Sequence, residues 1–324
     1  MCTAVSFKTK GFYFGRTLDY EFLYPCEVAF TPRNYLFDFR FVQKQESHNA
    51  MLGMAYVMNG YPLYFDAVNE HGLCMAGLNF VGNAVYREPQ KGKENVASFE
   101  FIPYILGRCG SVAQARLCLN NMNITDTPFT IGLPPSQLHW MIADKNGCIT
   151  VEAVAEGLKV YSNPVGVLTN NPPFPEQLFN LNKYACLSPK PMENRLSEKL
   201  ETSQYSRGMG ALGLPGDYTS QSRFVRGAFV KLNSHSEDSE EASVTQFFHI
   251  LNSVSVPEGP CEIQSGEYDK TLYSSCMSAD KGIYYYKPYE SHGLFAVDMR
   301  REDMEGNVLK CYPYLKESKV TLQN

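Results

Sequence analysis

Short runs in which apolar residues alternate with polar ones predict a chain rich in β-strands. The first two, Thr3 to Phe7 and Phe12 to Asp19, flank a turn at residues 8–11, as in a β-hairpin. Further strands are predicted at 51–57, 73–78, 140–143, 149–154, 165–168, 281–286 and 294–297. Helical spacing predicts helices at 99–106, after Ser111, after Thr219 and at 244–251.

The order of these elements indicates the fold class. Strands come in runs with helices grouped between them, instead of strict alternation, which favours an α+β fold of antiparallel sheets covered by helices. No clean domain boundary interrupts the pattern, so we predict a single domain over residues 2–324. Residues 187–216 are irregular and glycine-rich at their end, which indicates a long excursion from the core.

Composition excludes several classes of function. The chain has 324 residues, of which 44% are hydrophobic and 19% charged, enough to bury a substantial core. A net charge of −5 offers no basic surface for nucleic acid. The N-terminus has no basic and apolar leader, and no segment reaches the roughly 20 apolar residues of a membrane span, so we expect a cytoplasmic protein without stable membrane association.

Cysteine and histidine spacing gives no sign of a metal or cofactor. The ten cysteines are scattered without a Cys-x-x-Cys pair, which argues against a zinc site and a thioredoxin-type motif. The six histidines lack the spacing of metal ligands. We therefore expect no metal site and no bound cofactor.

Cys2 is the most informative residue. If Met1 is removed, the chain begins with a thiol and a free α-amine in one residue. Both groups titrate close to neutrality, so the amine can take the thiol proton directly or through one water, and no distant histidine is required. The alternative is that Cys2 is simply one of ten cysteines, and position alone does not decide between them.

Three more polar residues stand out against apolar surroundings. Counting by two along the second strand puts Arg16 on the face of Phe12 and Phe14, where it needs an anionic partner such as the Cys2 thiolate unless it reaches solvent. Asn79 and Asn170 each end an apolar run, a position that holds a side chain rigidly at the edge of a pocket. Singly, each asparagine is equally typical of a turn.

Cys2, Arg16, Asn79 and Asn170, together with Asp19, form a set in which the sequence resembles the choloylglycine hydrolase family, and within it the bile salt hydrolases. The likeness covers nearly the whole chain, and many ordered motifs are more specific than any single one. The matching stretches are residues 1–3, 14–19, 69–79, 138–140, 166–172, 213–217, 222–224, 246–251 and 284–286.

The resemblance implies a fold and a catalytic centre. The fold would be the αββα sandwich of N-terminal-nucleophile hydrolases. Cys2 would be the nucleophile and its freed amine the proton acceptor, with Arg16 beside the sulfur to favour thiolate. Asp19 would hold and orient the amine.

The resemblance also implies roles for residues distant in sequence. The Asn170 side-chain amide and the backbone N–H of Asn79 would stabilise the oxyanion of the tetrahedral intermediate. Arg223 would belong to the same charged network, or form an ion pair that supports the excursion before it.

The implied substrate is a bile salt, because penicillin V acylases of the same family carry tyrosine where this chain has Asn79. A steroid amide requires an apolar pocket with few polar groups. The positions that resemble its wall are Leu18, Tyr24, Met58, Phe65, Phe129, Ile131 and Leu133. Ser206 and Arg207, near the Gly-Leu-Pro-Gly-Asp motif, would favour taurine conjugates over glycine conjugates.

The expected partners are conjugated bile salts and further copies of the chain, since the resemblance implies a homotetramer in which the excursion makes subunit contacts. Two alternatives remain open. One is a penicillin V acylase or another N-acyl amidase, such as one acting on acyl-homoserine lactones. The other is a non-catalytic binder of bile acids or lipids that keeps Met1.

Overall fold

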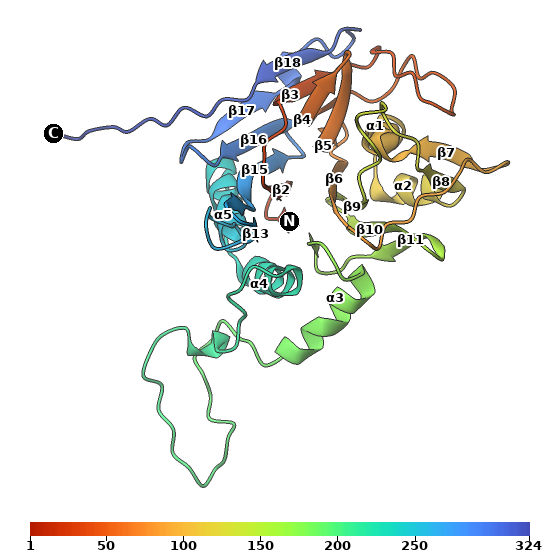
Figure 1. Cartoon of the computed structure of the whole chain (residues 1–324). Coiled ribbons are helices and arrows are strands. Elements are labelled where there is room, and N and C mark those ends of the chain that lie inside the picture. Colours follow the sequence, from red (N-terminus) through yellow and green to blue (C-terminus); the bar gives the residue numbers. More distant parts are fainter.

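Two antiparallel sheets lie face to face at the centre of the molecule (Figure 1). The computed structural model describes residues 1–324. The six-stranded sheet has, in spatial order, β12 (Val167–Leu168), β1 (Cys2–Lys8), β2 (Phe12–Tyr20), β15 (Lys270–Ser278), β16 (Ile283–Pro288) and β17 (Phe295–Asp298). The eight-stranded sheet has β11 (Gly157–Ser162), β10 (Gly147–Val154), β9 (Leu138–Asp144), β6 (Cys74–Asn79), β5 (Tyr61–Asn69), β4 (Met51–Met58), β3 (Cys26–Thr31) and β18 (Lys310–Pro313).

Helices cover the outer faces of both sheets. α4 (Ser220–Asn233) and α5 (Glu240–Asn252) pack on the six-stranded sheet, and α1 (Phe101–Arg108) and α2 (Val112–Leu119) pack on the eight-stranded one. The remaining helix, α3 (Phe174–Asn180), precedes the excursion. The αββα architecture expected from the sequence is confirmed. None of the helices combines the length and apolar character that crossing a membrane would require.

Small elements complete the structure. Two further two-stranded ribbons are formed by β7 (Glu94–Ala97) with β8 (Met122–Thr125) and by β13 (Glu262–Gln264) with β14 (Glu267–Tyr268). Short 3₁₀ helices span Ser98–Glu100, Leu181–Tyr184, Met209–Ala211 and Met299–Arg301.

The hydrophobic core has two parts, one on each side of the eight-stranded sheet. Val5, Met54 and Phe224 belong to the cluster that joins both sheets to α4 and α5, whereas Phe101 and Trp140 belong to the cluster under α1 and α2. β1 lies in the middle of the first cluster and is buried over six of its seven residues. The first residue of β1 is therefore held in a packed environment.

The hydrophobic pattern predicted several strands correctly. The predicted hairpin is β1 and β2, paired from Cys2 opposite Leu18 to Lys8 opposite Phe12. β15 was missed because the consecutive polar residues Ser274 and Ser275 interrupt the alternation in the middle of the strand, although both are buried. Residues 187–216 leave the body of the molecule between α3 and α4 in a long, largely exposed loop (Figure 1).

Candidate active site

The β1–β2 hairpin brings Cys2 and Arg16 into one buried region. Cys2 opens β1 with 2% of its surface exposed, and Arg16 lies opposite Ala4 on β2 with 1% exposed. The Arg16 guanidinium donates to the carbonyl oxygens of Thr17 (3.2 Å) and Gly77, and its Nη2 has no hydrogen-bond partner. Burial lowers the pKa of Arg16, but nearby negative groups, led by Cys2, outweigh it and the pKa is raised. Arg16 thus brings a fixed positive charge to the thiol.

Asp19 is the carboxylate of this site, and it is completely buried at the end of β2. Its two oxygens accept from Thr271 (2.7 Å) and Thr17 (3.2 Å), and the Arg223 guanidinium lies 3.9 Å away. Burial raises the pKa of Asp19, while Arg223 and the N-terminal ammonium oppose that shift. The Asp19 carboxylate therefore contacts side chains of the six-stranded sheet, from Thr17 and Thr271, and lies near Arg223 of the helix that begins at Ser220.

Arg223 reaches the same site from the first turn of α4. Its guanidinium is fully buried and donates to the Cys2 carbonyl, to the Thr3 hydroxyl (2.7 Å) and to Asn170 Oδ1 (2.7 Å). Burial lowers the pKa of Arg223. Of the two roles left open by the sequence, these contacts match the charged network around Cys2.

Asn170 links the start of the chain to the end of β6. Its Oδ1 accepts from the Cys2 backbone N–H at 2.9 Å, and its Nδ2 donates to the Asn79 carbonyl at 2.7 Å. The Asn170 backbone N–H donates to Ser220 Oγ at 2.8 Å, which fixes the residue against α4. A side-chain amide nitrogen therefore lies next to residue 79 and close to the nucleophile.

Met1 occupies the end of this site. Its ammonium donates to the Asp19 carbonyl (2.7 Å) and to Asp269 Oδ2 (2.9 Å). Burial lowers the pKa of this ammonium, but Cys2, Asp19 and Asp269 outweigh burial and raise it. While Met1 is attached, the Cys2 nitrogen is part of a peptide bond.

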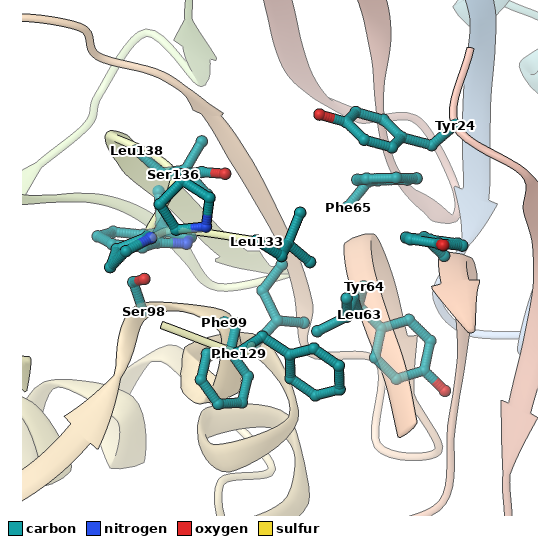
Figure 2. A pocket seen from close by; sticks show the side chains of 15 residues that line it. Tyr24, Leu63, Tyr64, Phe65, Ser98, Phe99, Phe129, Leu133, Ser136 and Leu138 are labelled. Atoms are coloured by element: carbon teal, nitrogen blue, oxygen red, sulfur yellow. The ribbon is translucent and has the colours of Figure 1, made fainter. Parts of the chain in front are cut away.

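Two cavities adjoin each other, and Cys2 lines one of them. One of about 110 Å³ is lined by Cys2, Arg16, Leu18, Asp19 and Asn79 among others, and the other, of about 120 Å³, is mostly apolar. Both are lined by Tyr24 and Phe65, so they meet at these rings. Figure 2 shows Leu133 in the apolar cavity between Leu138 and Phe65.

The structure brings together five of the seven expected pocket residues: Leu18, Tyr24, Phe65, Phe129 and Leu133 line one or both cavities. Met58, at the end of β4, and Ile131, fully exposed on a loop, line neither. Ser206 and Arg207 are exposed in the excursion and also line neither cavity.

Three acidic or basic groups near the site escaped the sequence reasoning. Asp66 is fully buried and accepts from Tyr284 at 2.6 Å and Ser275 at 2.9 Å; burial raises its pKa and the neighbouring Arg16 opposes this. The sequence also did not predict that Asp269 would pair with the Met1 ammonium. Nor did it predict the contact between His139 Nε2 and the Thr169 carbonyl at 2.9 Å. An isolated polar residue within an apolar strand was the available signal for Asp66 and His139.

Comparisons with known proteins show the family of the chain. The sequence model of the linear amide C–N hydrolases, choloylglycine hydrolase family, matches residues 2–312. A bile salt hydrolase/transferase from Lactiplantibacillus plantarum is 48% identical over the full length of both chains.

Solved structures give the same picture. The C2A mutant of conjugated bile acid hydrolase from Clostridium perfringens is 36% identical, superposes with a TM-score of 0.93 and is covered over the full length of both chains. Penicillin V acylase from Agrobacterium tumefaciens has a TM-score of 0.75 at 20% identity, over 96% of this chain and 90% of that one, which shows a shared fold.

Proposed function

This chain belongs to the choloylglycine hydrolase family of linear amide C–N hydrolases, and on that premise we propose that it hydrolyses glycine- and taurine-conjugated bile salts. The observation that carries the proposal is the buried network that joins the Cys2 backbone to Arg223 and Asn170, beside an apolar cavity. Full-length relatives named as bile salt hydrolases support the substrate class.

The proposed nucleophile requires removal of Met1. The freed Cys2 amine would take the thiol proton, and the sulfur would attack the amide carbonyl carbon. Arg16 and Asp19 would hold the charges of this step, and the electrostatic influence of Cys2 on Arg16 and of the N-terminal ammonium on Asp19 supports these roles. Collapse of the intermediate breaks the C–N bond, and the leaving amine takes the proton as glycine or taurine departs.

The tetrahedral oxyanion would be stabilised by neutral donors. Asn170 Nδ2 already lies 2.7 Å from the carbonyl of Asn79, so its second N–H can face a substrate oxygen held near the backbone of residue 79. Water would then attack the Cys2 thioester, with the amine as base, and the free bile acid would leave. Losing one oxyanion donor typically costs on the order of 10²–10³ in rate.

The apolar cavity supports a steroid as the acyl group. Tyr24, Phe65, Phe129 and Leu133 give it an apolar wall, and the cavity nearer Cys2, which Leu18 lines, would carry the polar groups beside the scissile bond. The penicillin V alternative rests on fold alone, because the structural relative of that activity is only 20% identical. Turnover of penicillin V exceeding that of glycocholate and taurocholate would favour it instead.

Replacing the nucleophile tests the proposal directly. We expect Cys2→Ala to release no glycine from glycocholate, because the thioester cannot form, while the protein stays folded with a similar melting temperature. Cys118→Ala, at a half-buried cysteine outside the site, is the matched control and should keep full turnover. An active Cys2→Ala protein would refute the mechanism.

Intact mass separates the enzyme from a non-catalytic binder. The mature, active protein should lack one methionine, since the amine that serves as base belongs to Cys2 only after Met1 has gone. An active preparation that retains Met1 throughout would overturn the amine as base, and an inactive, bile-acid-binding protein with Met1 in place would favour the binder.

Taurine preference is a finer part of the proposal. Ser206 and Arg207 would favour the sulfonate of taurine, and Arg207→Ala should then lower the ratio of taurocholate to glycocholate turnover. Both residues lie in the exposed excursion rather than in either cavity, so this effect requires the loop to approach the site. An unchanged ratio of the two turnover rates would contradict the taurine preference.

We further propose that the enzyme works in the cytoplasm, as a homotetramer.

A further inference from the structure

The place that Met1 occupies is shaped like a binding site for an amino acid. The Met1 ammonium has two acceptors, the Asp19 carbonyl at 2.7 Å and Asp269 Oδ2 at 2.9 Å. The Met1 carbonyl oxygen in turn accepts from the Asp19 backbone N–H at 3.0 Å. Both polar ends of this one residue are therefore recognised, through groups that belong to the rest of the chain.

Asp269 is the group that removal of Met1 affects most. It is 6% exposed, its Oδ2 pairs with the Met1 ammonium, and its Oδ1 is buried without any hydrogen-bond partner. When Met1 leaves, a buried carboxylate loses its ion-pair partner, which is costly unless another cation replaces it. The Asp19 carbonyl and N–H lose their partners at the same time.

We propose that, once Met1 has been removed, this place binds a free α-amino acid. The inference rests on the proposed function, in which Met1 is absent from the mature enzyme. The ligand's ammonium lies between the Asp19 carbonyl and Asp269, as the Met1 ammonium does, and its carboxylate, no longer bonded to Cys2, lies at a non-bonded distance from the Cys2 nitrogen. Its carboxylate accepts from the Asp19 N–H and faces the newly formed Cys2 ammonium, which Asn170 Oδ1 holds from the other side.

This arrangement determines which ligands fit. The ammonium and the carboxylate must be attached to the same carbon, as they were in Met1, so glycine and methionine satisfy every partner. Taurine separates its charges by one more carbon, and N-acetylmethionine has no ammonium for Asp269. A bound carboxylate beside the Cys2 amine also favours its protonated form, so an occupied site slows a reaction in which that amine is the base.

Binding of L-methionine and glycine to Met1-free protein, measured by isothermal titration calorimetry, tests the proposal. We expect both to bind, N-acetyl-L-methionine not to bind, and Asp269→Asn to weaken methionine binding by at least about tenfold. Glu258→Gln is the matched control, because Glu258 pairs with Lys270 at the surface beside Asp269 and its loss should change nothing. No binding by the wild type, or equal weakening in both variants, would overturn the proposal.

A Cys2→Ala protein separates this proposal from the proposed hydrolysis. Its small second residue still permits removal of Met1, and the amino-acid site does not use the thiol, so methionine should bind while turnover is absent. Loss of methionine binding in Met1-free Cys2→Ala protein would contradict the site. Turnover by that variant would instead contradict the nucleophile and leave the binding result intact. Protein shown by mass to retain Met1 should not bind methionine, because the place is filled.

Discussion

At the scale of single residues, several side chains of the site form hydrogen bonds with more than one partner. Asn170 accepts from both Cys2 and Arg223 through one oxygen and donates to Asn79 through its nitrogen. The orientation of its amide is therefore fixed from both ends, with the nitrogen turned toward residue 79. An amide held in this way needs little reorganisation to stabilise a charge that develops beside it.

Asn79→Tyr should shift the enzyme away from bile salts. Asn79 lines the cavity of about 110 Å³ beside Cys2, and a phenol ring there would fill space that the acyl group needs. We expect the kcat/KM for glycocholate to fall about tenfold or more, by analogy with the loss of a well-fitted contact. Paired measurements with glycocholate and penicillin V check this. Asn83→Tyr, on the loop beyond β6, is the control, and an unaltered ratio in Asn79→Tyr would mean that residue 79 does not discriminate.

At the scale of elements, strands β9 and β10 support the backbone around Asn170, the proposed oxyanion donor. His139 on β9 and Glu152 on β10 are both completely buried, with Nδ1 and Oε1 3.1 Å apart. The other ring nitrogen lies 2.9 Å from the Thr169 carbonyl, which can only accept, so Nε2 carries a proton. Glu152 also accepts from the backbone of Phe174 at the start of α3. The pair thus fixes the backbone on both sides of Asn170.

His139→Ala should lower kcat more than it raises KM, because it frees the backbone next to Asn170 without changing either cavity beside the site. We expect kcat to fall about tenfold or more, and the free energy of unfolding to fall by about 1–3 kcal/mol. His249→Ala, on the exposed side of α5, is the control. Partial recovery of kcat in His139→Gln, which can still donate to Thr169, would distinguish positioning from general loss of stability. A KM effect alone would contradict the assignment.

The sequence could predict elements and residues whose signal is local. The position of Cys2 directly after Met1 predicts a candidate nucleophile, and the place of Arg16 on an apolar strand face predicts a buried charge. The alternation of apolar and polar residues predicts the β1–β2 hairpin. Asp269 gave no such signal, because its importance comes from a contact with Met1 across 268 positions of sequence. Met58 and Ile131 were assigned to the pocket wall by the family resemblance, which does not show how the loops and strand ends of this chain surround the cavities, and neither residue lines them.

At the scale of the whole molecule, the layered fold explains how residues from four distant segments meet. β1 and β2 bring Cys2 and Asp19, the segment after β12 brings Asn170, and α4 brings Arg223 over the outer face of the same sheet. Because β1 is the neighbour of both β12 and β2, the start of the chain lies between all of these groups. Cys2, the proposed nucleophile, is thus held in the core although it directly follows Met1.

The excursion at residues 187–216 carries exposed apolar side chains, which favour assembly of several copies of the chain. Leu196, Leu200 and Tyr205 are 78%, 51% and 83% exposed on a loop that extends into solvent. We expect the wild type to have four times the chain mass in light scattering coupled to size exclusion. The double variant Leu196→Ser with Tyr205→Ser should dissociate at micromolar concentration, because burial of these side chains in a partner would be lost. Leu322→Ser, equally exposed near the C-terminus, should remain assembled, and a monomeric wild type would contradict the assignment of this loop to subunit contacts.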